Sequence, residues 1–413
     1  MTEPSRRRVV FFNRAYFPES SATSQLLTEL AEGLVETERF EVTVVAGIPM
    51  GRTDVHSPRP WGLVAAEAAG GVGILRCRGT VFSKERFWGR AVNYITYFLS
   101  ACWAGLHLKR PDVVVTLTDP PIVGLAAWIT AKRFGCPFVI SFRDLFPEVG
   151  RLAGGPRPVI EAILGRINRF LIRRADRLVA LGEDMRRRLI ESKGADPARM
   201  AIIPDWADGR TLTPGPKVNA FSTGEGLADR FVVMHAGNLG LSQNLDTLIE
   251  AASRLRDLPE LTVAIVGEGV RKETLKKQAA EQGLTQIRFL PYQPKERLGQ
   301  VFASADCFVI GLKSGLTGCI TPSKLYGILA AGRPFIAATE AGCDAYRLAE
   351  KTGCGLTAPP ADPAALAQRI RELYNDRAQA VEMGRRAREA FKPFDRPVGI
   401  RAYSELLEGF AKK

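Results

Sequence analysis

The stretch from residue 307 to residue 334 contains the side chains best suited to holding a charged ligand. An apolar strand is predicted at 307–312, and a loop rich in glycine, serine and threonine follows it. Pro322 fits the first turn of a helix that runs to about Ala331, where Gly332 would end it. A helix start presents free backbone N–H groups and a positive dipole end, and Lys324 adds a cation there. This combination suits a diphosphate, although it also describes an ordinary strand, loop and helix with a surface lysine.

Short apolar runs alternate with helical stretches along the chain, which is typical of parallel strands joined by crossover helices. The runs are rich in Val, Ile and Leu, as expected when both faces of a sheet are covered. The sequence therefore predicts the α/β class, with one domain at 1–205, a proline- and glycine-rich linker at 206–229 and a second domain at 230–391. Strands are expected at 9–12, 42–46, 73–76, 113–117, 138–141, 177–181, 200–203, 231–236, 262–266, 287–290, 307–312 and 334–337. Helices are expected at 24–36, 90–109, 123–134, 159–174, 244–255, 271–282, 294–303, 322–331, 363–374, 378–391 and 397–410.

Several polar motifs follow directly after predicted strands. Ligands of doubly wound sheets bind outside the carboxyl ends of the strands, so these motifs are expected to converge on a cleft. The first strand is not followed by a G-x-G-x-x-G pattern, which argues against a classical dinucleotide fold. The motifs that define this pattern are Tyr16–Glu19, Thr118–Pro121, Arg143–Glu148, Ile203–Asp208, Ala236–Gly240 and Val266–Gly269, together with 320–334.

In this order, the motifs resemble those of retaining glycosyltransferases of the large bacterial family four, which have the GT-B fold. More narrowly, they resemble the branch that builds exopolysaccharide and O-antigen repeat units, including colanic-acid and fucosamine transferases. The resemblance covers nearly the whole chain. It implies two doubly wound Rossmann-like domains that face each other across a cleft, with the C-terminal helix, 392–413, packing back on the first domain. It also implies a UDP-sugar donor and no metal cofactor.

The catalytic candidates lie in the motif after the strand at 138–141. Asp144 is the candidate for a carboxylate that orients or deprotonates the acceptor hydroxyl, or that binds a sugar hydroxyl. Arg143 stands where many relatives have a histidine that contacts the transferred sugar. Glu148 is the third candidate, and a structural pair between Arg143 and Glu148 is the alternative.

The donor side is expected in the second domain, and it departs from the family pattern. Asn238 and Gln243 stand where many relatives carry an arginine and a lysine, so other cations must stabilise the leaving group. The family's pair of glutamates, eight residues apart, falls on Cys319 and Gly327, which leaves Glu268 as a substitute for binding the ribose. The residues that the resemblance assigns to the donor are Gly237, Asn238, Gln243, Glu268, Arg271, Tyr292, Lys313, Thr321, Pro322, Ser323, Lys324 and Leu325.

Two of these assignments have a specific role. The cations nearest to the diphosphate by motif are Lys324, Lys313 and Arg271. Tyr292 stands where relatives contact the uracil base, with a buried core tyrosine as the alternative.

The acceptor side is expected in the loop after the first strand. Relatives often have two glycines there, and this chain has Ser20, Ser21 and Ala22, whose small side chains still permit close approach. A helix N-cap formed by Ser21 or Thr23 explains the same residues equally well.

Composition limits the function further. The 413 residues include three histidines and seven scattered cysteines without a C-x-x-C pair, which indicates a reducing compartment and excludes a His-rich metal site. The absence of a D-x-D triplet is typical of metal-independent transferases of the GT-B type. Residues 88–108 are the only candidate for a membrane span, and a helix packed on a sheet is the preferred interpretation.

The net charge of +13 is concentrated in residues 151–200, which carry 12 basic and 6 acidic side chains. Arg166, Arg169, Arg173 and Arg177 are predicted to share one face of a helix, beside an apolar face. Such a face could meet an anionic membrane surface or a lipid-pyrophosphate acceptor, or it could simply be solvated. Nucleic acid binding has no supporting module in the sequence.

The sequence thus predicts a cytoplasmic, peripherally membrane-associated retaining glycosyltransferase. It would move a sugar, an N-acetylated or deoxy hexose, from a UDP-sugar to a lipid-linked or saccharide acceptor in cell-surface polysaccharide synthesis. The first alternative is a non-catalytic GT-B protein that binds a nucleotide-sugar as a partner subunit. The second is a UDP-sugar 2-epimerase, which would need more histidines and acidic residues than the predicted cleft contains.

Overall fold

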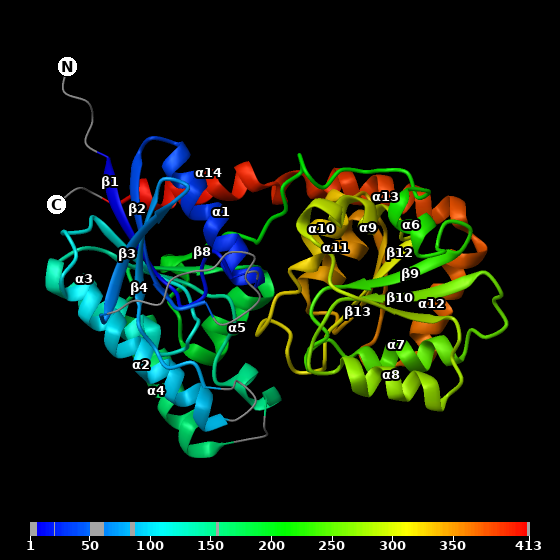
Figure 1. Cartoon of the computed structure of the whole chain (residues 1–413), viewed down its shortest axis with the longest axis horizontal. Coiled ribbons are helices and arrows are strands. Elements are labelled where there is room, and N and C mark those ends of the chain that lie inside the picture. Colours follow the sequence, from blue (N-terminus) through cyan, green and yellow to red (C-terminus); the bar gives the residue numbers. More distant parts are fainter. Residues whose placement is uncertain (1–5, 20, 50–61, 83–86, 154–156, 411–413) are drawn as a thin grey trace. The chain divides into compact units, whose positions relative to one another are not determined.

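The computed structural model describes residues 6–19, 21–49, 62–82, 87–153 and 157–410. The chain forms two compact units, each built around its own sheet (Figure 1). The N-terminal unit contains residues 1–204 and 397–413, and the C-terminal unit contains residues 205–396. The predicted α/β class with two parallel-sheet domains is confirmed.

The N-terminal unit has an eight-stranded sheet with the order β3-β4-β2-β1-β5-β6-β7-β8. All neighbouring pairs are parallel except β3 and β4. The central strand β1 pairs Val9 with Val42 on one side and with Val113 on the other. The strands are β1 (Arg7–Phe12), β2 (Phe40–Gly47), β3 (Val64–Ala69), β4 (Val72–Cys77), β5 (Val113–Thr116), β6 (Phe138–Ser141), β7 (Arg177–Ala180) and β8 (Met200–Ile202).

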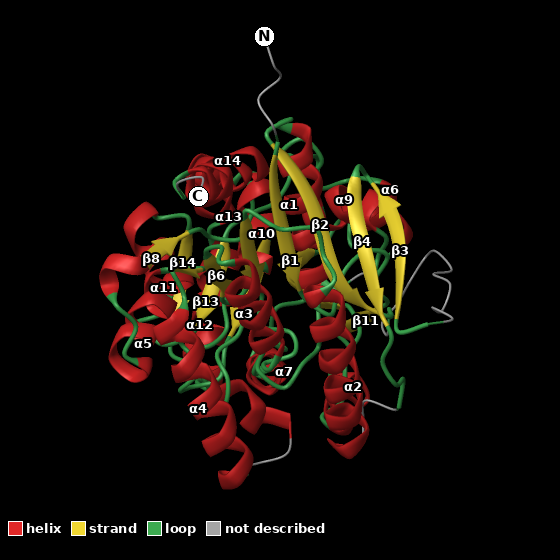
Figure 2. Cartoon of the chain, turned by 90° about the vertical axis from the view of Figure 1, so that its left-hand side faces the viewer, coloured by secondary structure: helices red, strands yellow, loops and turns green. Residues whose placement is uncertain are grey.

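Helices cover both faces of this sheet (Figure 2). From β1 the chain runs through β2 toward the edge formed by β3 and β4, and the connections from β4 onward run toward the other edge. Right-handed crossovers therefore place α1 opposite α2, α3, α4 and α5. The C-terminal helix α14 packs beside α1, where Ile400 fills the space that a side chain at Gly33 would occupy. These helices are α1 (Ala22–Glu36), α2 (Phe87–Leu106), α3 (Val123–Phe134), α4 (Pro158–Arg174), α5 (Glu183–Lys193) and α14 (Arg396–Glu408).

The C-terminal unit has a six-stranded, fully parallel sheet with the order β11-β10-β9-β12-β13-β14. Its core joins Val233, Ile265 and Ile336 of the sheet to Ile249 and Ile370 of the covering helices. The strands are β9 (Phe231–Ala236), β10 (Leu261–Val266), β11 (Ile287–Leu290), β12 (Cys307–Gly311), β13 (Phe335–Ala338) and β14 (Gly355–Ala358). The helices are α6 (Ala220–Gly224), α7 (Leu245–Ser253), α8 (Lys272–Glu281), α9 (Leu298–Ala303), α10 (Lys324–Ala330), α11 (Asp344–Thr352), α12 (Pro363–Asn375) and α13 (Arg377–Phe391).

Three features differ from the sequence prediction. The segment 206–229, predicted as a linker, belongs to the C-terminal unit and contains α6, whose first turn is capped by Asn219. The helix predicted at 322–331 begins at Lys324, so Pro322 precedes the helix instead of lying in its first turn. Four elements, β3, α5, α11 and β14, were not predicted at all.

Candidate functional site

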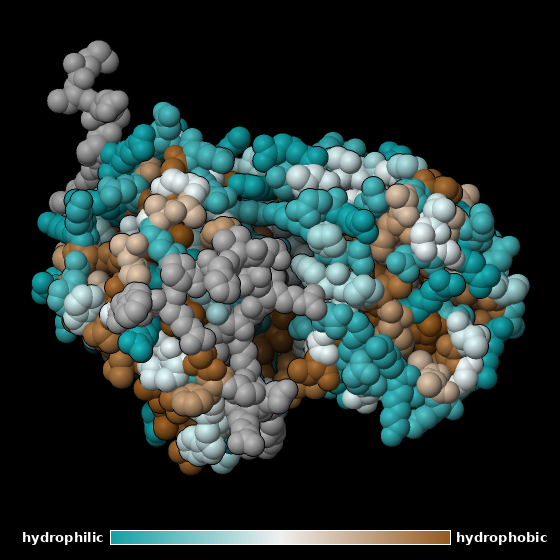
Figure 3. All heavy atoms as spheres, in the orientation of Figure 1, coloured by the Kyte–Doolittle hydropathy of each residue, from teal (hydrophilic) through white to brown (hydrophobic). Residues whose placement is uncertain are grey.

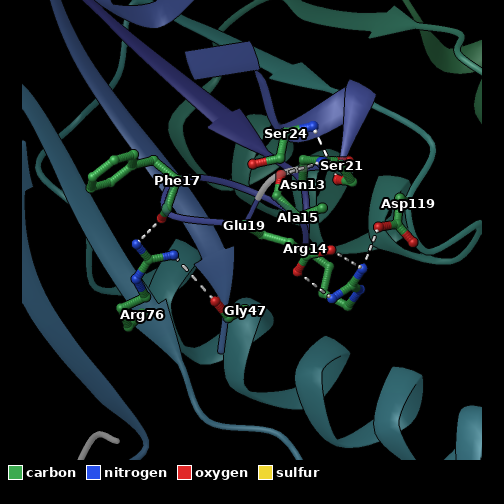
Figure 4. Close-up of polar contacts among 10 residues, drawn as sticks. All are labelled: Asn13, Arg14, Ala15, Phe17, Glu19, Ser21, Ser24, Gly47, Arg76 and Asp119. Carbon is green, nitrogen blue, oxygen red and sulfur yellow. Dashed lines mark hydrogen bonds and ion pairs between the residues drawn. The ribbon is translucent and has the colours of Figure 1, made fainter. Parts of the chain in front are cut away.

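The loop after β1 is fixed by a buried arginine (Figure 4). Arg14 contacts Glu19 at 3.3 Å and Asp119, from the loop after β5, at 3.0 Å. Burial alone would lower the pKa of the Arg14 guanidinium, but the charges of Asp119 and Glu19 outweigh burial and raise it. A second buried arginine, Arg76 of β4, donates to the backbone oxygens of Phe17 and Gly47. These ion pairs and hydrogen bonds hold the β1–α1 loop against β4 and the loop after β5, at the carboxyl end of the sheet.

The predicted acceptor residues lie at the start of α1. Ser21 is the N-cap of that helix, and its hydroxyl accepts a hydrogen bond from the Ser24 N–H at 3.4 Å. The capping alternative for Ser21 is therefore realised, and Ala22 is the first residue of α1, while Ser20 lies outside the described residues. The acceptor role of these residues stays a prediction.

The catalytic candidates follow β6. The Thr118 hydroxyl accepts from the backbone N–H groups of Arg143 at 3.1 Å and Asp144 at 3.3 Å, which fixes the loop after β6 to the loop after β5. Arg143 is buried and Asp144 is half-buried. Glu148 lies at the start of a short 3-10 helix, Glu148–Ala153, and forms an ion pair of 2.6 Å with the buried Lys193 of α5.

This geometry separates the three catalytic candidates. Asp144 sits at the carboxyl end of a central strand, where a reacting group belongs in this class of fold. The Glu148 carboxylate is instead held by Lys193, which is a structural pair of the kind that the alternative proposed. The catalytic role of each residue stays a prediction.

In the C-terminal unit, the loops that follow β9 and β10 interlock through glycines. The Gly237 N–H donates to the Val266 oxygen at 2.9 Å, and the Leu239 N–H donates to the Glu268 oxygen at 2.8 Å. Gly267 has a φ of +148°, and a Cβ atom there would lie 1.9 Å from the Gly237 oxygen. Only glycine fits such an approach, because both the backbone angle and the space exclude a side chain.

Lys324, the first residue of α10, reaches across to the end of β9. Its amine lies 3.2 Å from Nε2 of the buried His235 and donates to the side-chain oxygen of Gln243. Burial lowers the pKa of Lys324 to about 7. Burial, followed by the charge of Lys324, also holds the pKa of His235 well below its usual range, so the imidazole is neutral. The predicted residues Lys324 and Gln243 are thus brought together, and His235 joins them.

Two buried hydroxyl groups lie in the loop between β12 and α10. The side-chain oxygens of Thr317 and Thr321 are buried and find no hydrogen-bond partner among the described residues. Thr321 was predicted as a donor residue, and Thr317 was not. Buried polar atoms are normally satisfied, so unmatched hydroxyls in a loop indicate a missing ligand or solvent.

The other predicted donor residues are more dispersed. Arg271 is ion-paired with Asp246 of α7, and Glu268 is ion-paired with Lys272 at 2.7 Å. These pairs weaken the predicted roles of Arg271 as a leaving-group cation and of Glu268 as a ribose ligand, because each side chain already has a partner of opposite charge. Asn238, which follows β9, is exposed. The backbone N–H of Lys313 donates to the backbone oxygen of Ser242 at 3.0 Å. Pro322, Ser323 and Leu325 flank Lys324.

Two positions bear on binding of the nucleoside. Tyr292 is 39 % exposed, so the alternative of a buried core tyrosine is wrong. A Cβ atom at Gly327 would lie 3.1 Å from the Phe302 ring, so this position is filled by packing and leaves no room for a glutamate. How the ribose would be held therefore differs from the family pattern.

The arginine face on α4 is only partly as predicted. Arg166, Arg169 and Arg173 lie on α4 and are exposed, but Arg177 begins β7, because Ala175 ends the helix in an extended conformation. Arg174 takes its place, and a surface depression is lined by Arg166, Arg169, Phe170, Arg173 and Arg174.

The described residues contain neither a cluster of metal ligands nor a helix that could span a membrane. Within the residues that the structure describes, no three His, Cys, Asp or Glu side chains cluster in a way that could hold a metal ion. Over the same residues, no helix is both long and apolar enough to cross a bilayer, and residues 87–106 instead form α2 on the sheet. Metal independence remains a prediction.

Two units with largely parallel sheets and polar loops at the carboxyl ends of their strands have the architecture of the GT-B class. Residues 22–206 match the glycosyl transferase 4-like domain, and residues 221–390 match the glycosyl transferases group 1 family. A Pseudomonas aeruginosa protein named as glycosyltransferase WbjE is 30% identical over 295 residues, which cover 70% of this chain and 73% of that protein. The chain therefore belongs to the group 1, family 4-like glycosyltransferases, and it is an enzyme of that class.

Further relatives agree with this assignment. The WcaI protein of Escherichia coli K12, named as a colanic acid biosynthesis glycosyl transferase, is 25% identical over 384 residues, covering 88% of this chain and 91% of that protein. Anabaena HepE, solved with UDP and glucose, has a TM-score of 0.75 at 16% identity, with 98% of this chain and 100% of that chain covered. WaaG, a glycosyltransferase involved in lipopolysaccharide biosynthesis, has a TM-score of 0.71 at 14% identity, with 97% and 100% covered. At these identities the solved structures show the fold, and the predicted GT-B architecture is confirmed.

Sequence reasoning missed His235 and Thr317. His235 stands directly before the Ala236–Gly240 motif, and its burial at the end of β9 was visible only as one polar residue in an apolar run. Its contact with Lys324 spans 89 residues and could not be foreseen from spacing.

Proposed function

We propose that the protein is a retaining glycosyltransferase that uses a UDP-sugar, transferring an N-acetylated or deoxy hexose. The acceptor is a lipid-linked or free saccharide in cell-surface polysaccharide synthesis, on the cytoplasmic side of the membrane. The relatives named for colanic acid and lipopolysaccharide biosynthesis support this setting, and the solved neighbour with bound UDP supports the donor.

The observation that carries the proposal is the position of Lys324. Its amine is held by His235 and Gln243, beside the glycine-lined turn after β9. Neither partner is charged, since the imidazole of His235 is neutral, so the lysine charge is left for a ligand. A diphosphate fits this requirement, because it supplies the negative charge that restores full protonation of the amine.

The chemistry follows from these groups. Lys324, with the unmatched hydroxyls of Thr317 and Thr321, would stabilise the charge that develops on the departing UDP. Retention without an enzyme nucleophile implies front-face attack, with the acceptor hydroxyl entering beside the leaving group. Asp144 would orient that hydroxyl and accept its proton. No metal is required in this scheme, because the protein itself neutralises the diphosphate.

The test is transfer from a panel of UDP- and GDP-sugars to a lipid extract and to soluble saccharides. Release of UDP should depend on the acceptor, and NMR of the product should show the anomeric configuration of the donor. An inverted product would exclude the retaining mechanism. Turnover confined to GDP-sugars would exclude the proposed donor, and UDP-sugar binding without any transfer would favour the non-catalytic alternative.

A further inference from the structure

Helix α2 of the N-terminal unit differs from an ordinary surface helix, because it carries large apolar side chains on its outward face as well as Tyr97, Ala101 and Ala104 on its buried face. Its buried face contains the polar side chains of Asn93 and Ser100, which bond to the backbone of Phe82 and Arg78 in the preceding segment. Its outward face carries large apolar side chains at spacings of three and four residues, which form a continuous stripe. The stripe consists of Trp88, Val92, Ile95, Leu99, Trp103 and Leu106, each between 37% and 77% exposed.

This apolar stripe is too long to be incidental. A helix of 20 residues spans about 30 Å, and the stripe follows five of its turns. Val81 and Phe82, which the Asn93 side chain fixes beside the first turns of α2, are also exposed and extend the apolar surface. Contiguous exposed apolar surface of this kind marks an interaction site. Figure 3 shows hydrophobic atoms gathered over the lower part of the N-terminal unit, where Figure 1 places α2 and α4.

The charge around the stripe identifies the partner. Neither α2 nor α3 contains an acidic residue, and the single acid of α4, Glu161, is ion-paired with Arg151. The three helices form one layer, since Gly105 lets α2 approach Thr130 of α3 and Trp128 of α3 packs against Phe170 of α4. At the α4 end of this layer lies the depression lined by Arg166, Arg169, Phe170, Arg173 and Arg174.

The position of the layer adds a second argument. In parallel α/β units the helices run antiparallel to the strands, so the N-terminal ends of α2 and α4 lie at the carboxyl edge of the sheet (Figure 2). Val159 and Ile163, in the first turns of α4, are exposed there, as is Trp88 at the start of α2. Asp144 follows β6 at the same edge.

We propose that α2 is a membrane-insertion helix. Its apolar stripe enters the interfacial region of an anionic bilayer, while the arginine depression on α4 binds lipid phosphates. An apolar face flanked by cations is what an anionic lipid surface requires. The inference deepens the proposed function, because it names the surface at which a lipid-linked acceptor would reach Asp144. Membrane insertion can be tested without a transfer reaction, so a failure of this proposal can be distinguished from a failure of the proposed function.

The experiment is vesicle flotation of the full chain, with phosphatidylcholine alone or with phosphatidylglycerol added. Wild type should bind the anionic vesicles. The double change Arg166→Glu and Arg173→Glu should lower partitioning by about thirtyfold or more, since each arginine near the surface contributes about a factor of five. The change Leu99→Asp should lower partitioning by roughly tenfold or more, because it puts a charge in place of a leucine that would be inserted in the bilayer.

The matched control is Val381→Asp, which places the same charge on an exposed apolar position of α13 in the other unit. Its vesicle binding should equal that of wild type. Thermal unfolding of every variant shows whether the fold is retained. Equal binding of wild type and Leu99→Asp would overturn the proposal, as would absence of wild-type binding at low salt.

A second measurement uses the wild-type side chains. Trp88 and Trp103 lie on the stripe, so lipids brominated on the acyl chain should quench tryptophan fluorescence, and Trp88→Phe with Trp103→Phe should remove most of that quenching. No quenching in wild type would contradict insertion. If Leu99→Asp instead converts a dimer to a monomer in sedimentation, while wild type ignores vesicles, the stripe joins two copies of the chain and the proposal is wrong.

Discussion

Replacing Lys324 by methionine tests the proposed donor site in two ways, by the number of protons taken up when UDP binds and by the affinity for UDP. The pKa of Lys324 in the free protein is about 7, because the amine is buried without a carboxylate. At about pH 8, roughly nine in ten molecules would then hold the amine neutral, and UDP would have to bring back its proton. We expect wild type to take up about 0.9 proton per UDP at that pH.

The same linkage sets the pH dependence of affinity. Above about pH 7, the affinity of wild type for UDP should fall about tenfold per pH unit, or about 1.4 kcal/mol, until the amine of the complex itself titrates. Lys324→Met should weaken UDP binding by about 1.5–3 kcal/mol below pH 7, where the hydrogen bond to a charged group is lost. The difference in UDP affinity between wild type and Lys324→Met should become smaller as pH rises, because wild type must then protonate Lys324 in order to bind UDP.

Calorimetry in two buffers of different ionisation enthalpy measures the proton uptake. The Met variant provides the baseline for titration of UDP itself, and Lys351→Ala, an exposed lysine on α11, is the control for charge alone. The neutral His235 contributes nothing in this range, since its pKa lies well below its usual value. Equal uptake in wild type and the Met variant, or none in wild type, would refute the assignment of Lys324 to the diphosphate.

The stability of the ligand-free protein provides an independent test of the lowered pKa of Lys324. Burial makes Lys324 bind its proton less tightly when folded than when unfolded, so between about pH 7 and 10.5 the unfolded chain holds more protons. The contribution of Lys324 to the free energy of unfolding therefore rises with pH in that window and is flat below it. Lys324→Met should remove this slope, which chemical denaturation at a series of pH values measures.

Three further outcomes are expected. Asp144→Asn should lower transfer by about a hundredfold or more while UDP affinity, measured by calorimetry, stays near wild type, because a positioned acid–base group contributes about 10²–10⁴-fold; normal turnover would move the role to Glu148. Gly267→Ala should lower the free energy of unfolding by more than about 2 kcal/mol and abolish UDP binding, since its Cβ would lie 1.9 Å from the Gly237 oxygen; a variant with wild-type melting would show that the two loops can separate at no cost. EDTA should leave the UDP-induced rise in melting temperature unchanged, and strict dependence on Mg²⁺ or Mn²⁺ would contradict the metal-free scheme.

The sequence predicted the elements whose local pattern agreed with their place in the fold. The buried strands β6 and β9, the partly buried edge strand β11 and the helix α3 were predicted with their observed bounds. Short, mainly apolar runs mark the strands, and Gly135 marks the end of α3. The missed elements lack such signals. Strand β3 is alanine-rich and is defined by its antiparallel pairing with β4, and α5 carries charged residues on most of its turns.

The candidate site was predicted less completely than the fold. Lys324 could be singled out by its loop, but its lowered pKa arises from burial beside His235 and Gln243, which are 89 and 81 residues away. Likewise, Glu148 looked catalytic by its motif until the structure placed Lys193 at 2.6 Å from its carboxylate. Contacts between distant segments determine whether a polar side chain is buried or already paired, and the spacing of residues along the chain does not show these contacts.

The position of α14 in the N-terminal unit has a consequence for how the protein is made. Tyr403 of α14 bonds to Ser141 of β6 at 2.7 Å, and Arg7 at the start of β1 donates to the Leu407 oxygen at 3.0 Å. Strand β1 therefore contacts a helix that is synthesised 400 residues after it. During synthesis, the C-terminal unit has all of its residues before the N-terminal unit does, which reverses the usual order in which domains are completed. A nascent chain that stops before residue 397 can assemble the whole sheet of the C-terminal unit, but its N-terminal unit still lacks one covering helix.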